Sequence, residues 1–355
     1  MNPVRILLLL PLLAAPSPAR PFRQALPGYV FQFPRDHGAH PGFAIEWWYF
    51  TGHLWSADGR RRYGYQLTFF RRGLDAAWTG SPTWRTDQIH LAHAAFTDVA
   101  QGRFGMEERL NREGIPAAAA AGSLDLRNAS WSARMAAGGR IHLSFQVAGA
   151  ALELDLDPAT RPVVFGADGV TRKGADPAAA SHYITFPRLA SAGTLRQGGR
   201  DTVLRGSSWM DHEFSSSQLA PGQVGWDWAG IQLRDGRSLM LYRLRDAGGA
   251  QDPWSTLTEV AADGRILRTT PDFQLTGGAW RAPSGASYPL PLRLRAWDAD
   301  WTLEPLVPDQ ELRPRAGAAI TYWEGACRVR DRDGREVGDA YVELTGYAHS
   351  MQGRF

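Results

Sequence analysis

The chain has 355 residues, of which 44% are hydrophobic and 11% aromatic, and its formal net charge is +3. This small charge, without any basic run interleaved with aromatic residues, gives no support for nucleic-acid binding. The single cysteine, Cys327, cannot form an internal disulfide, so the hydrophobic cores have to stabilise the fold.

Residues 1–19 have the layout of a secretory signal peptide. Arg5 precedes a short run of leucines and other apolar residues, and small residues follow near Ser17 and Ala19. The run is too short to cross a bilayer. We therefore expect an exported mature protein, located in the periplasm or secreted.

Composition and turn signals predict an all-β protein. The chain has 14 Trp. Its 38 Gly and 23 Pro separate segments that are rich in aromatic residues or in which apolar and polar residues alternate. Apolar runs flank Asp-Gly pairs, which supply the positive φ angles of tight hairpin turns. The predicted hairpins cover 46–72, 225–246 and 326–347, around Asp58-Gly59, Asp235-Gly236 and Asp333-Gly334. The alanine run at 117–122 is expected to be a loop or a single turn.

The chain is longer than one core usually organises, so two domains are expected. Two hairpins share a W-x-aromatic-x-G pattern, beginning at Trp48 and at Trp226, that is followed by Asp-Gly-Arg. A repeat separated by one domain length predicts two related β-barrels or sandwiches. The Ser/Pro/Gly-rich stretch at 215–223 is the expected linker. We therefore place one domain at 30–215 and a second at 222–355.

The stretch GSSWMDHEF holds three consecutive ionisable residues, Asp211, His212 and Glu213. In an extended strand Asp211 and Glu213 share one face, and His212 points to the other. A strand therefore cannot present all three to one ion, and no His-Glu-x-x-His or paired-Cys motif is present, so we predict no metal and no cofactor. No Gly-x-Ser-x-Gly or Ser-x-x-Lys motif is present either, so Ser207 and Ser208 are expected to cap a strand end.

Acid–base chemistry fits this stretch better. A carboxyl group among Trp and Met side chains has its charged form destabilised, so its pKa rises and it can donate a proton near neutral pH. The candidate carboxyl groups are those of Glu46, Asp211, Glu213 and Asp227. Such an acid could protonate an alkene, aromatic faces would stabilise the cation, and a carboxylate or His212 could deprotonate the attacking water. An alternative stays open, in which the carboxylates pair with arginines and the tryptophans are core.

Six segments resemble the AttH-like family, which is related to carotenoid 1,2-hydratases (hydroxyneurosporene synthases) and is often described as predicted secreted hydrolases. They are HPGFAIEWWYFTGHL (40–54), HLAHAAFTD (90–98), ITFPRLASAGTL (184–195), GSSWMDHEF (206–214), GWDWAGIQLRDGRSLMLYRLRD (225–246) and YVELTGY (341–347). The similarity covers nearly the whole mature chain. It implies an all-β fold of two consecutive lipocalin-like (calycin) antiparallel β-barrels.

The resemblance also implies a reaction. Carotenoid 1,2-hydratases add water to a terminal alkene of an acyclic carotenoid without a cofactor. Their acid–base set comprises a His and a Trp in the segment that matches 209–214, and a Tyr and an Asp on a following strand. His212 matches the His, and Tyr242 matches the Tyr. Phe214 stands in the place of the Trp, and no acid follows Tyr242.

We therefore expect an exported protein that binds an apolar, terpenoid or lipid-like small molecule at the junction of the barrels and hydrates it without a cofactor. The expected catalytic residues are Asp211, His212, Asp227 and Tyr242. The expected ligand-binding residues are Glu46, Trp47, Trp48, Tyr49, Trp209, Glu213, Trp226 and Trp228. The alternatives are a non-catalytic carrier that serves an envelope transporter or contacts the membrane surface, and a secreted hydrolase.

Overall fold

The computed structural model describes residues 21–74, 86–314 and 320–353. The predicted signal peptide at 1–19 lies outside these residues. Within them, the elements are β-strands apart from one 3-10 turn, η1 (Arg35–His37), which confirms the all-β prediction. No helix in the described ranges is long and apolar enough to cross a membrane.

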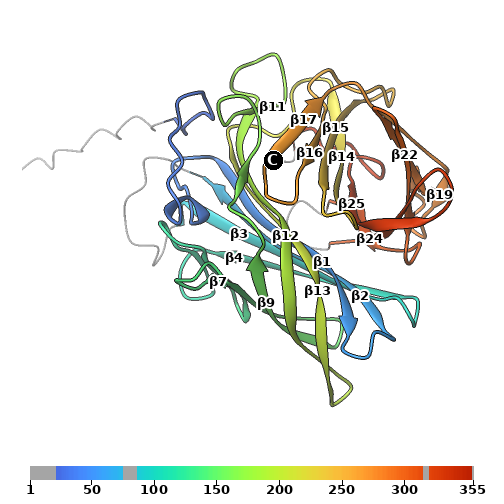
Figure 1. The fold of residues 1–355 in the computed structure, drawn as a ribbon. Coiled ribbons are helices and arrows are strands. Elements are labelled where there is room, and N and C mark those ends of the chain that lie inside the picture. The colour runs from blue at the N-terminus through green and yellow to red at the C-terminus, as the bar shows by residue number, and fades with distance from the viewer. Residues whose placement is uncertain (1–20, 75–85, 315–319, 354–355) are drawn as a thin grey trace, which may run out of the picture.

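The first sheet has 13 strands and nearly closes into a barrel (Figure 1, blue to green). Its main path is β4-β3-β2-β1-β13-β12-β9-β8-β7-β6-β5, and β10 and β11 pair with β12. Asn111 on β4 donates a hydrogen bond to Asn128 on β6 (2.7 Å), which ties the two ends of the sheet together. The strands are β1 (Ile45–Ser56), β2 (Arg62–Gly73), β3 (Gln88–Asp98), β4 (Arg103–Arg112), β5 (Ala117–Ala119), β6 (Asp125–Asn128), β7 (Trp131–Met135), β8 (Ile141–Val147), β9 (Ala150–Pro158), β10 (Val163–Val164), β11 (Thr171–Arg172), β12 (Ala180–Gln197) and β13 (Arg200–Ser215).

The second sheet has 10 strands and forms an open half-barrel beside the first (Figure 1, yellow to red). Its path is β17-β16-β15-β14-β25-β24-β22-β21-β18, with β23 paired to β24, and β19 and β20 form a separate ribbon. The strands are β14 (Gln223–Leu233), β15 (Ser238–Asp246), β16 (Thr256–Val260), β17 (Ile266–Thr270), β18 (Gln274–Gly277), β19 (Trp280–Arg281), β20 (Ser287–Tyr288), β21 (Leu292–Ala296), β22 (Ala299–Pro305), β23 (Glu311–Leu312), β24 (Tyr322–Arg330) and β25 (Glu336–Leu344). The predicted lipocalin-like pair of barrels is confirmed, the second one as an open half-barrel.

The three predicted hairpins are present as β1–β2, β14–β15 and β24–β25. Their Asp-Gly turns place Gly59, Gly236 and Gly334 at φ values of 70°, 94° and 79°, which L side chains adopt only with strain. The prediction of a loop or turn at 117–122 is wrong for its first part. Ala117–Ala119 forms the edge strand β5, because its backbone pairs with β6.

Strand alternation gives each sheet two buried faces near the junction. On β1, Trp48 and Phe50 pack in the core of the first barrel, whereas Tyr49 faces the second barrel. On β14, Ile231 packs in the core of the second barrel, whereas Trp228 faces the first. A third apolar cluster, with members from both sheets, therefore forms the contact between the barrels.

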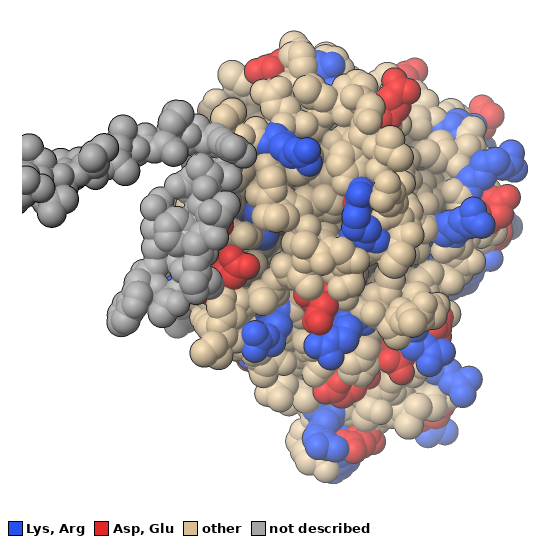
Figure 2. Space-filling model, turned by 90° about the vertical axis from the view of Figure 1, so that its left-hand side faces the viewer, with Lys and Arg blue, Asp and Glu red and all other residues tan. Residues whose placement is uncertain are grey.

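The face drawn in Figure 2 carries acidic and basic side chains interspersed with one another, without a gathering of one sign. This distribution matches the small net charge of +3. The chemically distinctive residues of the chain lie instead in its interior, at the junction of the sheets.

Candidate active site between the two barrels

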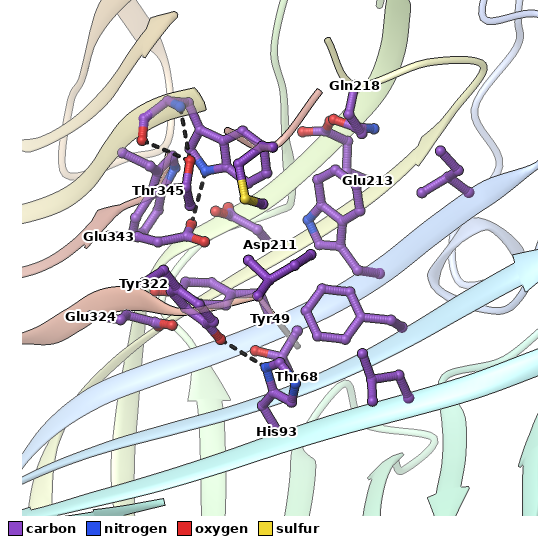
Figure 3. A pocket seen from close by; sticks show the side chains of 18 of the residues that line it. Tyr49, Thr68, His93, Asp211, Glu213, Gln218, Tyr322, Glu324, Glu343 and Thr345 are labelled. Atoms are coloured by element: carbon purple, nitrogen blue, oxygen red, sulfur yellow. Dashed lines mark hydrogen bonds between the residues drawn. The ribbon is translucent and has the colours of Figure 1, made fainter. Parts of the chain in front are cut away.

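A cavity of about 290 Å³ lies between the facing surfaces of the two sheets (Figure 3). The residues of its wall come from β1 to β4, β12 and β13 of the first sheet and from β14, β15, β24 and β25 of the second. The apolar side chains of the wall include Ile45, Trp47, Phe70, Ile89, Leu91, Leu110, Trp226, Trp228, Ile320 and Met351. The cavity is close to the lower end of the range for small-molecule sites, which begins at about 300 Å³. The two barrels thus share one cavity, while the interior of each is filled by its own core.

Asp211, on β13, is a buried carboxyl group in the wall of this cavity. Its oxygens accept hydrogen bonds from Tyr183 Oη (2.7 Å) and Trp209 Nε1 (2.7 Å). Trp228 Nε1 in turn donates to Tyr183 Oη (2.9 Å), so both sheets help to orient the carboxyl group. Burial raises the pKa of Asp211 to about 7, although these hydrogen bonds act in the opposite direction. Near neutral pH, Asp211 is therefore present both as acid and as carboxylate.

Glu324 on β24 and Glu343 on β25 form a second acidic group, directly opposite each other in the antiparallel pair. Burial and the negative charge of Glu343 raise the pKa of Glu324 well above its usual range. Burial also raises the pKa of Glu343 to about 7, although Glu343 accepts a hydrogen bond from Trp226 Nε1 (3.2 Å). In Figure 3 the carboxyl groups of Glu343 and Asp211 lie on the same side of the cavity. The site therefore holds two neighbouring carboxyl groups that both exchange protons near pH 7.

Lys173, the only lysine of the chain, lies behind the cavity wall and is fully buried. Its ammonium group binds the carboxylate of Glu213 and the side-chain oxygen of Gln218, both of which line the cavity. Lys173 Nζ also lies 5.3 Å from the ring centre of Trp47 and 5.1 Å from that of Tyr242. Burial lowers the pKa of Lys173, and Glu213 opposes this change. The ion pair therefore gives Glu213 a direct charge partner, which Asp211 two residues earlier does not have among the described residues.

Seven of the residues expected from the sequence meet at the cavity. They are Trp47, Tyr49, Asp211, Glu213, Trp226, Trp228 and Tyr242. Trp209 lies behind Asp211, to which it donates a hydrogen bond, and does not line the cavity. The alternation of β13 places Asp211 and Glu213 on this face, as the sequence predicted.

Glu46, Trp48 and His212, which were expected in the same site, lie on the opposite face of β1 and β13. His212 Nε2 contacts Glu46 Oε1 (2.9 Å), and its ring stacks on Trp48 with centroids 4.7 Å apart. Burial would raise the pKa of Glu46, but Arg71 together with the neighbouring histidines lowers it below its usual range. Strand alternation is the reason for this placement, because even-numbered residues of both strands point into the first barrel.

His40, Glu46 and His212 bring three possible metal ligands within 4.8 Å of one another. Both oxygens of Glu46, however, already accept hydrogen bonds, from Arg71 Nε (2.8 Å), from the His40 backbone N–H (2.9 and 3.0 Å) and from the imidazoles. An ion at this position would lie beside the buried Arg71 guanidinium, which already balances the charge of Glu46. The arrangement is therefore that of a hydrogen-bonded structural cluster, and it does not fit a cation well.

Asp227 was also expected in the site, but it points into the second barrel. It pairs with Arg245 (3.0 Å) and Arg243 (3.4 Å) and accepts a hydrogen bond from Tyr347 Oη (3.0 Å). Asp227 lies between Trp226 and Trp228 in the sequence, so alternation sends it to the face opposite theirs. In the structure Asp227 is therefore an arginine-paired carboxylate, which is the arrangement that the alternative interpretation expected.

The sequence reasoning missed Lys173, Tyr183, Glu324 and Glu343. Glu343 lies in the quoted YVELTGY segment, where Val342 and Leu344 point to the barrel core. This alternation predicts that Glu343 points outward, but it gives no sign that the other barrel covers this outward face. The pairing of Glu324 with Glu343 depends on the register between β24 and β25, which local patterns do not specify.

A family model described as AttH-like matches residues 24–347. The crystal structure of an AttH protein from Nitrosomonas europaea is 33% identical in sequence, has a TM-score of 0.83, and aligns over 92% of this chain and 100% of that chain. Kievitone hydratase from Nectria haematococca is 13% identical with a TM-score of 0.70, over 93% of this chain and 98% of its own. The structure of CghA with Sch210972 is 12% identical with a TM-score of 0.50, over 92% and 97%, and these last two similarities concern the fold alone. A search of curated proteins gave no significant match. The family match spans most of the chain, so this protein belongs to the AttH-like family.

Proposed function

We propose that this protein binds an apolar, alkene-bearing small molecule of terpenoid or lipid-like type between its two barrels and adds water to the alkene without a cofactor. The observation that carries the proposal is the carboxyl group of Asp211, which is buried in an aromatic-lined cavity with its pKa raised to about 7. A carboxylic acid that stays protonated near neutral pH is suited to general acid catalysis. The fold shared with kievitone hydratase is compatible with this reaction class.

In the first step, the protonated carboxyl of Asp211 transfers its proton to one alkene carbon, and the positive charge forms on the neighbouring carbon. Ring faces that line the cavity, such as those of Trp226 and Trp228, stabilise a nearby cation through their quadrupoles. Tyr183 and Trp209 donate hydrogen bonds to the Asp211 carboxylate that results. These two hydrogen bonds stabilise the negatively charged carboxylate more than the neutral acid. They therefore stabilise the transition state of the proton transfer more than the bound substrate, which lowers the barrier.

In the second step, water attacks the cationic carbon, and a new C–O bond forms. The water gives its extra proton to a carboxylate, for which Glu343 is suited because its pKa of about 7 leaves part of it ionised. Exchange of this proton with the solvent and reprotonation of Asp211 restore the starting state. The overall change is alkene plus water to alcohol, with no net gain or loss of protons.

Incubation of the purified protein with acyclic terpenoid alkenes tests the proposal. A product heavier by one water, formed by the wild-type protein, supports the hydratase. Retention of unchanged ligand without turnover would support the alternative, a carrier of hydrophobic molecules. Identification of the small molecules that co-purify with the protein would select the alkenes for this assay.

We also propose that the protein acts in the periplasm or outside the cell. The support is the signal-peptide layout of residues 1–19, with Arg5 before a short apolar run. Fractionation of the source cells tests this location, because export predicts a processed chain in the periplasmic or extracellular fraction.

A further inference from the structure

Three carboxyl groups face the cavity without a basic partner among the residues that the structure describes. They are Asp211, Glu324 and Glu343. The fourth cavity carboxylate, Glu213, is balanced by Lys173. An unpaired carboxylate in a low-dielectric site is costly, so the site is stabilised by any positive charge that can enter it.

Aromatic rings surround the same space. Trp47, Trp226, Trp228 and Tyr242 line the cavity, and Lys173 Nζ already lies 5.3 Å from Trp47 and 5.1 Å from Tyr242. Rings at this distance from a cation attract it, and aromatic cages of this kind recognise substituted ammonium ions. The wall thus combines the two features that favour an organic cation, aromatic faces and uncompensated carboxyl groups.

The hydrogen bonding of the Glu324 region is also incomplete. Tyr49 Oη and Glu324 Oε1 are buried, and neither makes a hydrogen bond of good geometry among the described residues, although the hydroxyl groups of Tyr49 and Tyr322 lie close enough to Glu324 to favour its ionised form. Both residues line the cavity. Buried polar atoms with poorly formed hydrogen bonds are uncommon in folded proteins, and a cationic ligand beside Glu324 would add to the weak interaction that the two tyrosines supply.

We propose that the cavity binds a hydrophobic organic cation of the alkyl- or arylalkylammonium class, with its charge next to the Glu324–Glu343 pair and its apolar groups against the aromatic rings. The inference rests on the cavity of the proposed function, and it deepens that function because such an ion mimics the cation formed during hydration. Binding itself requires no hydration step. The two proposals can therefore fail separately.

The protonation of the pair gives the binding a pH dependence. The ionisable groups that line the cavity around the pair, or lie next to its wall, are Tyr49, Arg71, Arg72, His93, Lys173, Tyr183, Asp211, Glu213, Tyr242, Tyr322 and Tyr341. Arg71 pairs with Glu46, and Lys173 pairs with Glu213, so their charges are already balanced. A bound cation favours the ionised form of Glu324 and Glu343. We therefore expect proton release on binding and an affinity that rises with pH.

Isothermal titration calorimetry with benzyltrimethylammonium tests this inference, because this ion carries its charge at every pH. Its neutral carbon isostere, neopentylbenzene, has the same shape. The wild-type protein should bind the cation at least ~10-fold more tightly than the isostere, as expected for a charge matched in a desolvated site. Titrations in two buffers of different ionisation enthalpy should show proton release at neutral pH with the cation only.

Glu324→Gln and Glu343→Gln should each weaken cation binding by at least ~10-fold and leave isostere binding unchanged, because only the charge of the site is altered. Glu153→Gln, at an exposed position on the first barrel, is the matched control and should bind as the wild type does. Equal affinity for cation and isostere in the wild-type protein would overturn the inference, and so would failure of the cation to bind. Both of these outcomes are measured on the wild-type protein, so they test the inference even if a variant fails to fold. Cation binding without hydration of any alkene would overturn the proposed reaction alone.

Discussion

Glu324 on β24 and Glu343 on β25 lie directly across from each other in the antiparallel pair, and both carboxyl groups face the cavity between the barrels. Ionisation of both carboxyl groups at once has a high free-energy cost, because the groups are buried and their negative charges repel each other. The pKa of Glu324 is well above its usual range, and that of Glu343 is about 7. The free energy of unfolding therefore depends on the protonation of Glu324 and Glu343.

The first prediction concerns the dependence of stability on pH. The pKa of Glu343 rises from 4.5 to about 7 on folding, so the folded protein holds more protons than the unfolded chain in this window. The stability that this group contributes is complete below the window and is lost as pH rises through it. Glu343→Gln removes the ionisation, so between about pH 5 and about pH 8 the variant should gain roughly 1–3 kcal/mol relative to the wild type. Urea unfolding at several pH values measures the difference, and parallel pH curves for the two proteins would contradict the prediction.

The second prediction concerns the buried Lys173–Glu213 ion pair. Lys173→Met leaves the carboxylate of Glu213 buried without its partner, so the free energy of unfolding should fall by about 3–5 kcal/mol. The double variant with Glu213→Gln should recover part of the loss, because no uncompensated charge remains. Arg60→Met, at an exposed position, should stay within about 0.5 kcal/mol of the wild type in the same denaturation experiment. A single variant as stable as this control would show that the ion pair does not matter for stability.

The third prediction concerns Arg71, which pairs with Glu46 and donates to the backbone oxygens of His40 and Phe43. Arg71→Met should destabilise the protein by about 3–5 kcal/mol, because it leaves a buried carboxylate and buried carbonyls without their donor. The neighbouring Arg72→Met, at an exposed position, is the control and should change stability little. If the cluster around Glu46 held a metal ion instead, a chelator would lower the unfolding midpoint of the wild-type protein. We expect no change with the chelator, because Arg71 already balances the charge.

Local sequence patterns predicted the parts of the structure that depend on neighbouring residues. Asp-Gly pairs located three hairpins, and alternation separated Asp211 and Glu213 from His212. The same alternation predicts that Asp227 points away from the face that carries Trp226 and Trp228. In the structure Asp227 pairs with Arg243 and Arg245 on that opposite face. The expectation failed there because residues close in sequence were treated as close in space.

The rest of the site depends on contacts between distant strands, which no local pattern encodes. Lys173 reaches Glu213 across 40 positions, and Tyr183 reaches Asp211 across 28. The outward face of β25 is buried only because the first barrel covers it. From the sequence alone, Glu343 is expected to be an acidic residue on the outward face of a strand. In the folded protein it lines the cavity between the barrels.

The central claim is that Asp211 supplies the proton for hydration of an alkene bound between the barrels. The most direct measurement is the incorporation of isotopically labelled water into acyclic terpenoid alkenes by the wild-type protein, by Asp211→Asn and by Asp155→Asn, an exposed control on β9. The account predicts labelled alcohol from the wild type and the control, and a rate lower by about 100-fold or more for Asp211→Asn. The wild-type rate should be greatest near pH 7 and fall at higher and lower pH, because Asp211 has to be protonated and Glu343 ionised. Labelled product from Asp211→Asn at the wild-type rate would contradict it, as would the absence of labelled product from the wild type with alkenes that it binds.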